Sequence, residues 1–99
     1  MSLPIRISSE ARVDLLEAWA WYEDQRLGLG DEFTVCVEAA LEKVARFPEA
    51  WATVHGEVRR VIVRRFPYGV FYVVEDGELV VLAVAHGRRE PGYWLSRRR

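Results

Sequence analysis

Hydrophobic and polar positions follow a helical period in the first half of this 99-residue chain. The first predicted helix begins at Ser8 or Ser9, because a serine hydroxyl accepts a hydrogen bond from a free amide of the first turn. It extends to about Arg26. One side is apolar, with steps of three and four residues, and consists of Ala11, Leu15, Ala18, Trp19 and Tyr22. Trp21 falls between this side and an acidic one, so it is either a core-edge residue or part of an exposed contact surface.

A second helix is predicted after the turn Leu27-Gly28-Leu29-Gly30. Asp31 is its expected cap, and the helix covers Glu32 to about Phe47, where Pro48 ends it. Its apolar positions form one continuous helical stripe, made of Phe33, Val37, Ala40, Leu41, Val44 and Phe47. Two helices joined by a tight glycine turn form an antiparallel hairpin, and its apolar face is expected to lie on a sheet.

The sheet comes from a different pattern, with β-branched and aromatic residues in short runs. Three consecutive strands are predicted at Val58–Arg65, Tyr68–Glu75 and Leu79–His86. The sequence Asp76-Gly77 between the last two runs predicts a tight hairpin, because both turn residues need positive φ. A short first strand is predicted within Leu3–Ser8, with no indication of its partner, and residues 48–57 are predicted to be a connector. These elements give an α+β domain in the order β-α-α-β-β-β, with the helical hairpin packed on a mostly antiparallel twisted sheet.

Composition restricts the class of protein. A chain of this length with 51% hydrophobic residues is expected to form a single domain over residues 1–99. No stretch approaches the roughly 18 apolar residues of a transmembrane helix, and the first ten residues lack a signal-peptide core, so we expect a cytoplasmic protein that does not bind membranes. The single cysteine, Cys36, excludes an internal disulfide. No metal or other cofactor is expected.

Charge is divided unevenly along the chain. Residues 1–57 contain 11 acidic and 5 basic side chains, a net charge of −6. Residues 58–99 contain 4 acidic and 9 basic side chains, a net charge of +5, and all nine cations are arginines, five of them in an arginine-rich tail at residues 88–99. This division favours a surface for polyanions or acidic partners on the sheet side. A general preference for arginine over lysine explains the residue type but does not explain the division.

Several short motifs occur in a characteristic order. The first group is Ala11-x-x-Asp14-Leu15, Trp21-Tyr22-Glu23, Gly28-Leu29-Gly30-x-x-Phe33, Glu38 to Leu41 and Phe47-Pro48. The second group is Val58-Arg59-Arg60, Phe66-Pro67-Tyr68-x-Val70-x-Tyr72 and Ala83-Val84-x-His86-x-Arg88-Arg89-x-Pro91-x-Tyr93-Trp94. Their order and spacing resemble those of the RelE/ParE toxin superfamily over nearly the whole chain.

The resemblance implies the toxin of a bacterial type II toxin–antitoxin module. It implies a cognate antitoxin protein that neutralises the toxin, and binding to operator DNA through the antitoxin. A homodimer or a toxin–antitoxin hetero-oligomer is the expected assembly. Within this superfamily, ParE-like members poison DNA gyrase by binding it, whereas RelE-like members are metal-free endoribonucleases that cut messenger RNA in the ribosome.

A candidate catalytic set follows from the same resemblance and consists of Arg60, His86, Arg88, Arg89 and Tyr93. His86 has the pKa range of an acid–base catalyst, the arginines suit a phosphate, and Tyr93 suits base stacking or proton donation. The predicted strand Tyr68–Glu75, however, contains no basic residue, and no lysine follows Lys43. We therefore rank a ParE-like toxin first, a RelE-like endoribonuclease second, and a non-toxic interaction module on the same fold third.

Overall fold

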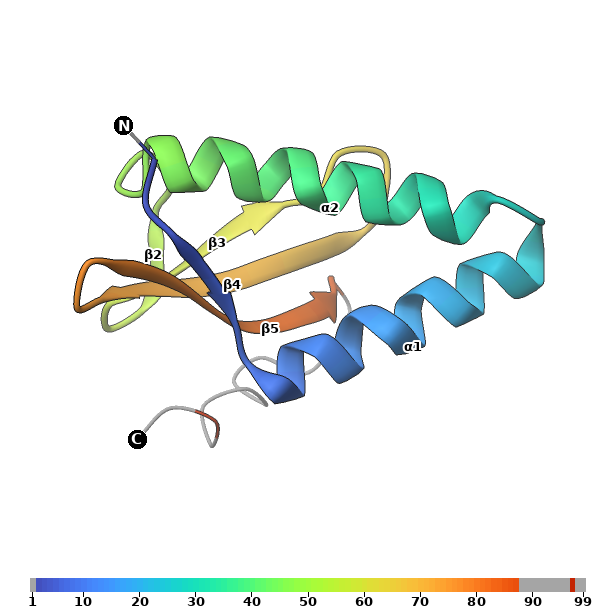
Figure 1. Ribbon diagram of the computed structural model, residues 1–99, viewed down its shortest axis with the longest axis horizontal. Helices are drawn as coiled ribbons and strands as arrows, with labels where there is room; N and C mark the ends of the chain where they lie inside the picture. Colours follow the sequence, from blue (N-terminus) through green and yellow to red (C-terminus); the bar gives the residue numbers. More distant parts are fainter. Residues whose placement is uncertain (1, 88–96, 98–99) are drawn as a thin grey trace.

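The computed structural model describes residues 2–87 and Arg97. Two helices lie over one face of a five-stranded sheet (Figure 1). In chain order the elements are β1 (Ile5–Ile7), α1 (Ser9–Gln25), α2 (Leu29–Arg46), β2 (Thr53–His55), β3 (Val58–Ile62), β4 (Tyr68–Glu75) and β5 (Glu78–His86). The predicted α+β class and the helical hairpin on a sheet are therefore confirmed.

The strand order in the sheet is β1-β5-β4-β3-β2. Strands β2 to β5 form an antiparallel meander, and the predicted turn between β4 and β5 has φ of 52° at Asp76 and 76° at Gly77. Strand β1 adds at the other side of β5 and is parallel to it, with Ile5 opposite Leu79 and Ile7 opposite Val81. This pairing joins segments from the two ends of the domain, and no sequence pattern indicated it.

Strand β2 corrects the prediction that residues 48–57 are only a connector. Every residue of β2 is exposed, so no buried apolar side chain marks this three-residue segment as a strand. Strand β3 is also shorter than predicted and ends at Ile62, three residues before Arg65. Arg65 has a φ of 73°, a conformation that does not continue a strand.

Helix α1 begins where the serine predicted it. The Ser8 hydroxyl oxygen accepts a hydrogen bond from the backbone N–H of Ala11 at 3.1 Å. Helix α2 begins three residues earlier than predicted, at Leu29, and its cap is Gly28 with a φ of 89° rather than Asp31. The carboxylate of Glu23 accepts from the backbone N–H groups of Gly28 at 2.7 Å and Gly30 at 2.9 Å. The start of α2 is thus capped by a side chain of α1.

The main core lies between the helices and the sheet. Phe33 is fully buried there, and its ring centroid lies 5.3 Å from that of Tyr22, 5.2 Å from that of Phe66 and 5.1 Å from that of Tyr68. The predicted stripe of α2 is buried except at its last member, Phe47, which is 58% exposed. Helix α2 ends at Arg46, so Phe47 has left the helical period and does not face the sheet.

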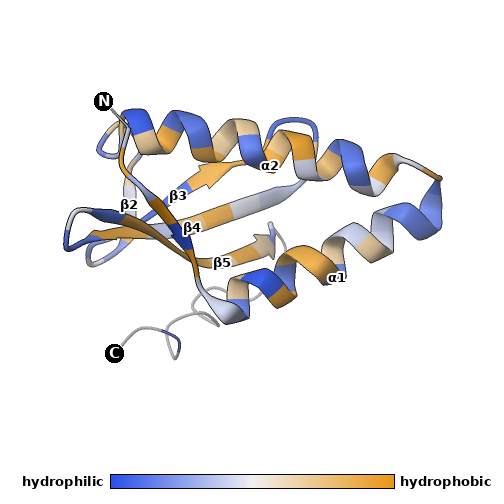
Figure 2. Ribbon diagram, viewed as in Figure 1, coloured by the Kyte–Doolittle hydropathy of each residue, from blue (hydrophilic) through white to orange (hydrophobic). Residues whose placement is uncertain are grey.

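A second buried cluster lies on the face of the sheet away from the helices, and it consists of Val58, Val73, Val80, Leu82 and Ala83. Strand β5 contributes to both clusters, which agrees with its nearly continuous apolar sequence (Figure 2). The register between β4 and β5 shifts at one point. Phe71 pairs with Ala83, and the next residue, Tyr72, pairs with Val81, so Leu82 is an extra residue in β5. Such a bulge changes which side chains face each side of a sheet.

Candidate functional site

The structure describes two of the five predicted site residues. His86 is the last residue of β5, and Arg60 is the middle residue of β3. The other three, Arg88, Arg89 and Tyr93, lie outside the described residues. Their predicted roles stay predictions. The positions of His86 and Arg60 show whether these two members of the set lie close together.

His86 faces the helices. It pairs with Tyr68 of β4, and the two ring centroids are 5.4 Å apart. Directly paired residues of neighbouring strands point to the same face. The Tyr68 ring contacts Tyr22 of α1 and Phe33 of α2, with centroid distances of 6.0 and 5.1 Å. His86 therefore lies on the face of the sheet that the helical hairpin covers.

Arg60 faces the other way. It pairs with Phe71, which in turn pairs with Ala83 of the second buried cluster. The aliphatic part of the Arg60 side chain crosses Gly69 so closely that a Cβ atom at Gly69 would lie 3.0 Å from Arg60 Cδ. Arg60 is exposed and has no acidic side chain bound to it among residues 2–87 and 97. Its position suits a cationic surface on the face away from the helices.

The structure thus does not bring Arg60 and His86 together. A proton-transferring group and a phosphate-binding group serve one reaction only when both reach the same substrate atoms. Strict alternation along β5 from Val80 would place His86 on the face away from the helices, and the bulge at Leu82 reverses this. A bulge of this kind has no signature in the apolar sequence of β5, so the separation was not foreseeable from the sequence.

His86 lines an open groove between α1 and the ends of β4 and β5. The groove has a volume of about 490 Å³. Helix α1 supplies Asp14, Glu17 and Trp21 to one wall, and the sheet supplies Tyr68 and His86 to the other. Burial and the neighbouring Tyr68 raise the pKa of Tyr22, which also lines the groove. Its hydroxyl is therefore neutral at physiological pH, and the α1 wall of the groove carries the carboxylates of Asp14 and Glu17.

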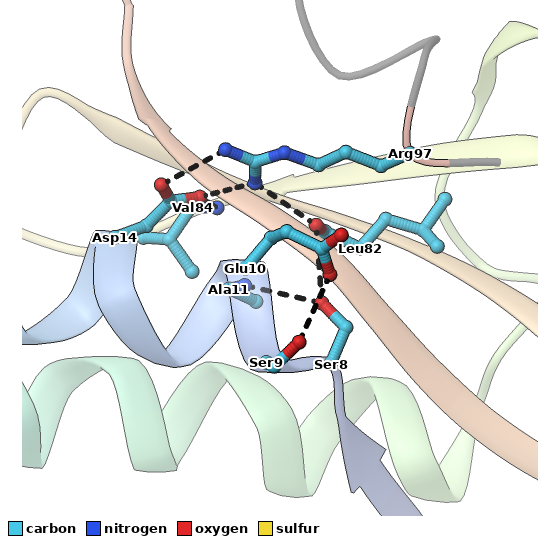
Figure 3. A network of polar contacts seen from close by, with 8 residues as sticks. All are labelled: Ser8, Ser9, Glu10, Ala11, Asp14, Leu82, Val84 and Arg97. Carbon is cyan, nitrogen blue, oxygen red and sulfur yellow. Dashed lines mark hydrogen bonds and ion pairs between the residues drawn. The ribbon is translucent and has the colours of Figure 1, made fainter.

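Asp14 holds Arg97, close to the end of the chain, against the edge of β5 (Figure 3). Its carboxylate accepts two hydrogen bonds from the Arg97 guanidinium, at 2.7 and 3.2 Å, and one from the backbone N–H of Val84 at 2.9 Å. Arg97 also donates to the Leu82 carbonyl oxygen at 3.1 Å. Strand β1 pairs with β5 only from Leu79 to Val81, so these side-chain bonds take the place of a neighbouring strand beyond that point.

Sequence reasoning missed the role of Asp14. Asp14 lies towards the acidic side of the first helix, yet its side chain is only 11% exposed. The one available signal was its place in the motif Ala11-x-x-Asp14-Leu15. Among the described residues, no group of three or more histidine, cysteine, aspartate or glutamate side chains is arranged to hold a metal ion. No helix in the described part of the chain is long and apolar enough to cross a membrane.

The solvent side of α1 carries large apolar side chains. Val13 is 53% exposed, Leu16 is 65% exposed and Trp21 is 59% exposed. Val13 and Leu16 are one helical turn apart and lie on the same side of the helix. Exposed apolar side chains grouped on one element are typical of a contact surface for another protein.

Comparison with known proteins places the chain in a family. The family model described as the ParE toxin of the type II toxin–antitoxin system parDE matches residues 5–91. The chain belongs to the ParE toxin family. A curated relative, Toxin ParE2 of Mycobacterium tuberculosis, is 29% identical over 92 residues, which cover 92% of this chain and 88% of the relative.

Solved structures share the same fold. A chain of the chromosomal ParDE toxin–antitoxin system from P. aeruginosa matches with a TM-score of 0.76 and 13% identity, covering 86% of this chain and 96% of that chain. A chain of the RelBE2 toxin–antitoxin complex from Mycobacterium tuberculosis matches with a TM-score of 0.60 and 21% identity, covering 87% and 99% of the two chains. A mutant of the E. coli toxin RelE in the free state matches over both full lengths with a TM-score of 0.63 and 16% identity. The RelE/ParE superfamily predicted from the motifs is confirmed.

Proposed function

We propose that this ParE-family toxin arrests bacterial growth by binding a protein target such as DNA gyrase, and that a cognate antitoxin neutralises it. The observation that carries this proposal is the exposed apolar side of α1, where Val13, Leu16 and Trp21 are each more than half exposed. Burying such side chains in an interface is a main source of binding free energy between proteins. A toxin that acts by occupying its target needs such a surface and no assembled catalytic group.

The separation of the candidate catalytic residues supports the same proposal. Arg60 and His86 lie on opposite faces of the sheet, and β4 contains no basic residue that would complete either one. An antitoxin partner is supported by the solved relatives, two of which come from toxin–antitoxin systems. We propose that this chain forms a hetero-oligomer with its antitoxin, and that any operator DNA is bound through the antitoxin.

A second candidate function is a RelE-like, metal-free endoribonuclease that acts on messenger RNA in the ribosome. The observation in its favour is the position of Arg60, whose side chain crosses Gly69 next to Phe71 on the face away from the helices. A cation beside an aromatic ring suits the phosphate and base of RNA. Arg88, Arg89 and Tyr93 would have to complete this site.

The test compares the two activities with the same purified chain. We expect it to inhibit DNA supercoiling by purified gyrase and to leave a reporter message intact in a translation extract. Leu16→Asp should abolish the inhibition, whereas Val35→Asp, which introduces the same charge at a 62% exposed valine of α2, should preserve it. Primer extension that reveals codon-linked cuts, reduced at least about tenfold in Arg60→Gln, would instead establish the nuclease.

Induced expression without the antitoxin provides the cellular control. Growth arrest accompanied by gyrase-linked DNA breaks supports the proposal. Normal growth with accumulation of the folded chain contradicts any toxic activity and leaves the third alternative, a non-toxic interaction module.

A further inference from the structure

We propose that the groove between α1 and the ends of β4 and β5 binds an arginine side chain of the toxin's proposed protein target, with Glu17 as its ion-pair partner and Trp21 as its stacking surface. The inference rests on the proposed function, because it specifies the chemistry of a protein partner that the toxin recognises. It assigns to this groove a ligand that the exposed apolar side of α1 alone does not predict.

The α1 wall has the two groups that a guanidinium needs. Glu17 and Trp21 are four residues apart, so they are neighbours on the same side of the helix. Glu17 is exposed and has no hydrogen bond or ion pair within residues 2–87 and 97. The Trp21 ring packs edge-on against Tyr22, with a centroid distance of 5.1 Å, which fixes its orientation while 59% of the residue stays exposed.

The opposite wall adds aromatic surface. The rings of Tyr68 and His86 are nearly perpendicular to each other, with centroids 5.4 Å apart, and both line the groove. A planar guanidinium combines favourable stacking on aromatic faces with a bidentate bond to a carboxylate, and a lysine ammonium does so less well. The groove volume of about 490 Å³ leaves room for an arginine side chain and the backbone that carries it.

The same helix already binds one arginine. Asp14 lies one turn before Glu17, lines the same groove, and holds the Arg97 guanidinium through two hydrogen bonds. Helix α1 has five acidic residues and one basic residue, a net charge of −4. Glu17 therefore repeats the carboxylate that Asp14 uses, at a position to which no arginine of residues 2–87 or 97 is bonded. The charge of the wall favours a cationic occupant.

The binding test uses the complete purified chain labelled with ¹⁵N. The probe is the acetylated and amidated peptide Gly-Arg-Gly, and the matched neutral probe is Gly-Gln-Gly with the same caps. We expect Gly-Arg-Gly to produce a saturable shift of the Trp21 indole N–H and of the Glu17 amide at millimolar concentration, since one side chain supplies little binding free energy. The indole signals of Trp19 and Trp51 are internal references, because neither lines the groove.

Substitutions then assign the effect to the groove. Glu17→Gln should weaken Gly-Arg-Gly binding about threefold, which is a typical loss for an exposed ion pair. Glu38→Gln is the control, because it removes the same charge from an exposed position of α2 outside the groove. Trp21→Leu should also weaken binding, and an unchanged dispersion of the amide signals would confirm that each variant is folded.

Three results would overturn the inference. The first is equal binding of Gly-Gln-Gly. The second is evidence that the peptide does not bind at Glu17, which would be either undiminished binding of Gly-Arg-Gly to Glu17→Gln or displacement of Arg97 from Asp14 by the peptide. The third is a Trp21 signal that shifts in the double variant Arg88→Gln/Arg89→Gln but not with added peptide, because the occupant would then be this chain itself.

The two proposals fail separately. If the wild-type chain binds Gly-Arg-Gly at Glu17 but neither inhibits gyrase nor arrests growth, the proposed function is wrong and the inference about the groove stands. If the chain inhibits gyrase but does not bind the peptide, the proposed function stands and the inference about the groove is wrong.

Discussion

The two helices of the hairpin use their apolar side chains in different ways. Helix α2 buries seven residues along one stripe against the sheet. Helix α1 is nearly as long but buries only three, and it exposes Val13, Leu16 and Trp21 on its other sides. Helix α2 therefore stabilises the fold, whereas much of the apolar surface of α1 stays exposed and is the surface that we propose for a partner.

The contrast explains how a chain of this size combines a packed core with the binding surface that we propose. The core needs one strongly amphipathic helix, and α2 supplies it through residues such as Phe33 and Val44, both fully buried. Helix α1 contributes the small residues Ala11 and Ala18 to the core, which let it pack closely on the sheet. Its larger side chains are then available for recognition.

The largest expected effect is loss of stability in Phe33→Ala. Phe33 is fully buried and contacts three other aromatic rings, so removing it leaves a cavity that costs about 3–5 kcal/mol of unfolding free energy. Urea denaturation measures this change. Leu16→Ala of α1 is the comparison and should change the unfolding free energy by less than about 0.5 kcal/mol. Similar losses in the two variants would contradict the difference between the helices.

An intermediate effect is expected for Asp14→Asn, at the one place in the described chain where α1 makes a nearly buried ion pair. The change leaves the Arg97 guanidinium without its charged partner and should cost about 2 kcal/mol of unfolding free energy. The matched variants are Arg97→Gln and the double substitution. A coupling energy of about 1 kcal/mol or more in this cycle confirms the contact, and strictly additive losses would show that the pair is not formed in solution.

A small stability effect but a large functional effect is expected for Leu16→Asp. The residue is 65% exposed, so its unfolding free energy should change by no more than about 0.5 kcal/mol, while growth arrest falls at least about tenfold. Val35→Asp of α2 should leave both properties unchanged. If the two variants lose toxicity equally, the binding surface extends over both helices and the assignment to α1 is wrong.

The smallest effect concerns the pH dependence of α2. Hydrogen bonds from Arg65 and then Arg26 lower the pKa of Glu32 in the folded chain. Folding therefore favours the ionised carboxylate of Glu32. Its contribution to the free energy of unfolding is present above the pKa that Glu32 has in the unfolded chain, and it is lost as the pH falls through the lower pKa of the folded chain. Glu32→Gln should therefore flatten the acid side of the profile of melting temperature against pH. Glu38→Gln, an exposed carboxylate of the same helix, should keep the wild-type profile.

Local signals predicted the elements whose causes are local. The Ser8 cap marked the start of α1, and Asp76-Gly77 marked the β4–β5 turn, because each depends on a few neighbouring residues. The start of α2 was predicted wrongly for the opposite reason. Its first backbone amides are capped by Glu23 of the preceding helix. A capping side chain on another helix is not among the residues next to the start of α2, so the local sequence there does not indicate it.

The candidate site was less predictable than the fold. The motifs indicated which residues to consider, and His86 does line a groove. They did not indicate that Arg60 lies on the other face, nor that Glu17 and Trp21 would stand opposite His86 and Tyr68. Such relations depend on how a helix packs on strands that lie about 50 to 70 residues later in the chain.

The sequence by itself determined the α+β class, the helical hairpin, the β4–β5 hairpin and the superfamily, since periodicity, caps, turn residues and motif order are properties of consecutive residues. Only the tertiary structure decided the parallel pairing of β1 with β5, the bulge at Leu82 and the bond between Asp14 and Arg97. Each of these joins groups distant in the chain, and their pairing follows from packing around a shared core. The tertiary structure also decided on which faces of the sheet Arg60 and His86 lie. Those positions in turn support the kind of partner that we propose for this toxin.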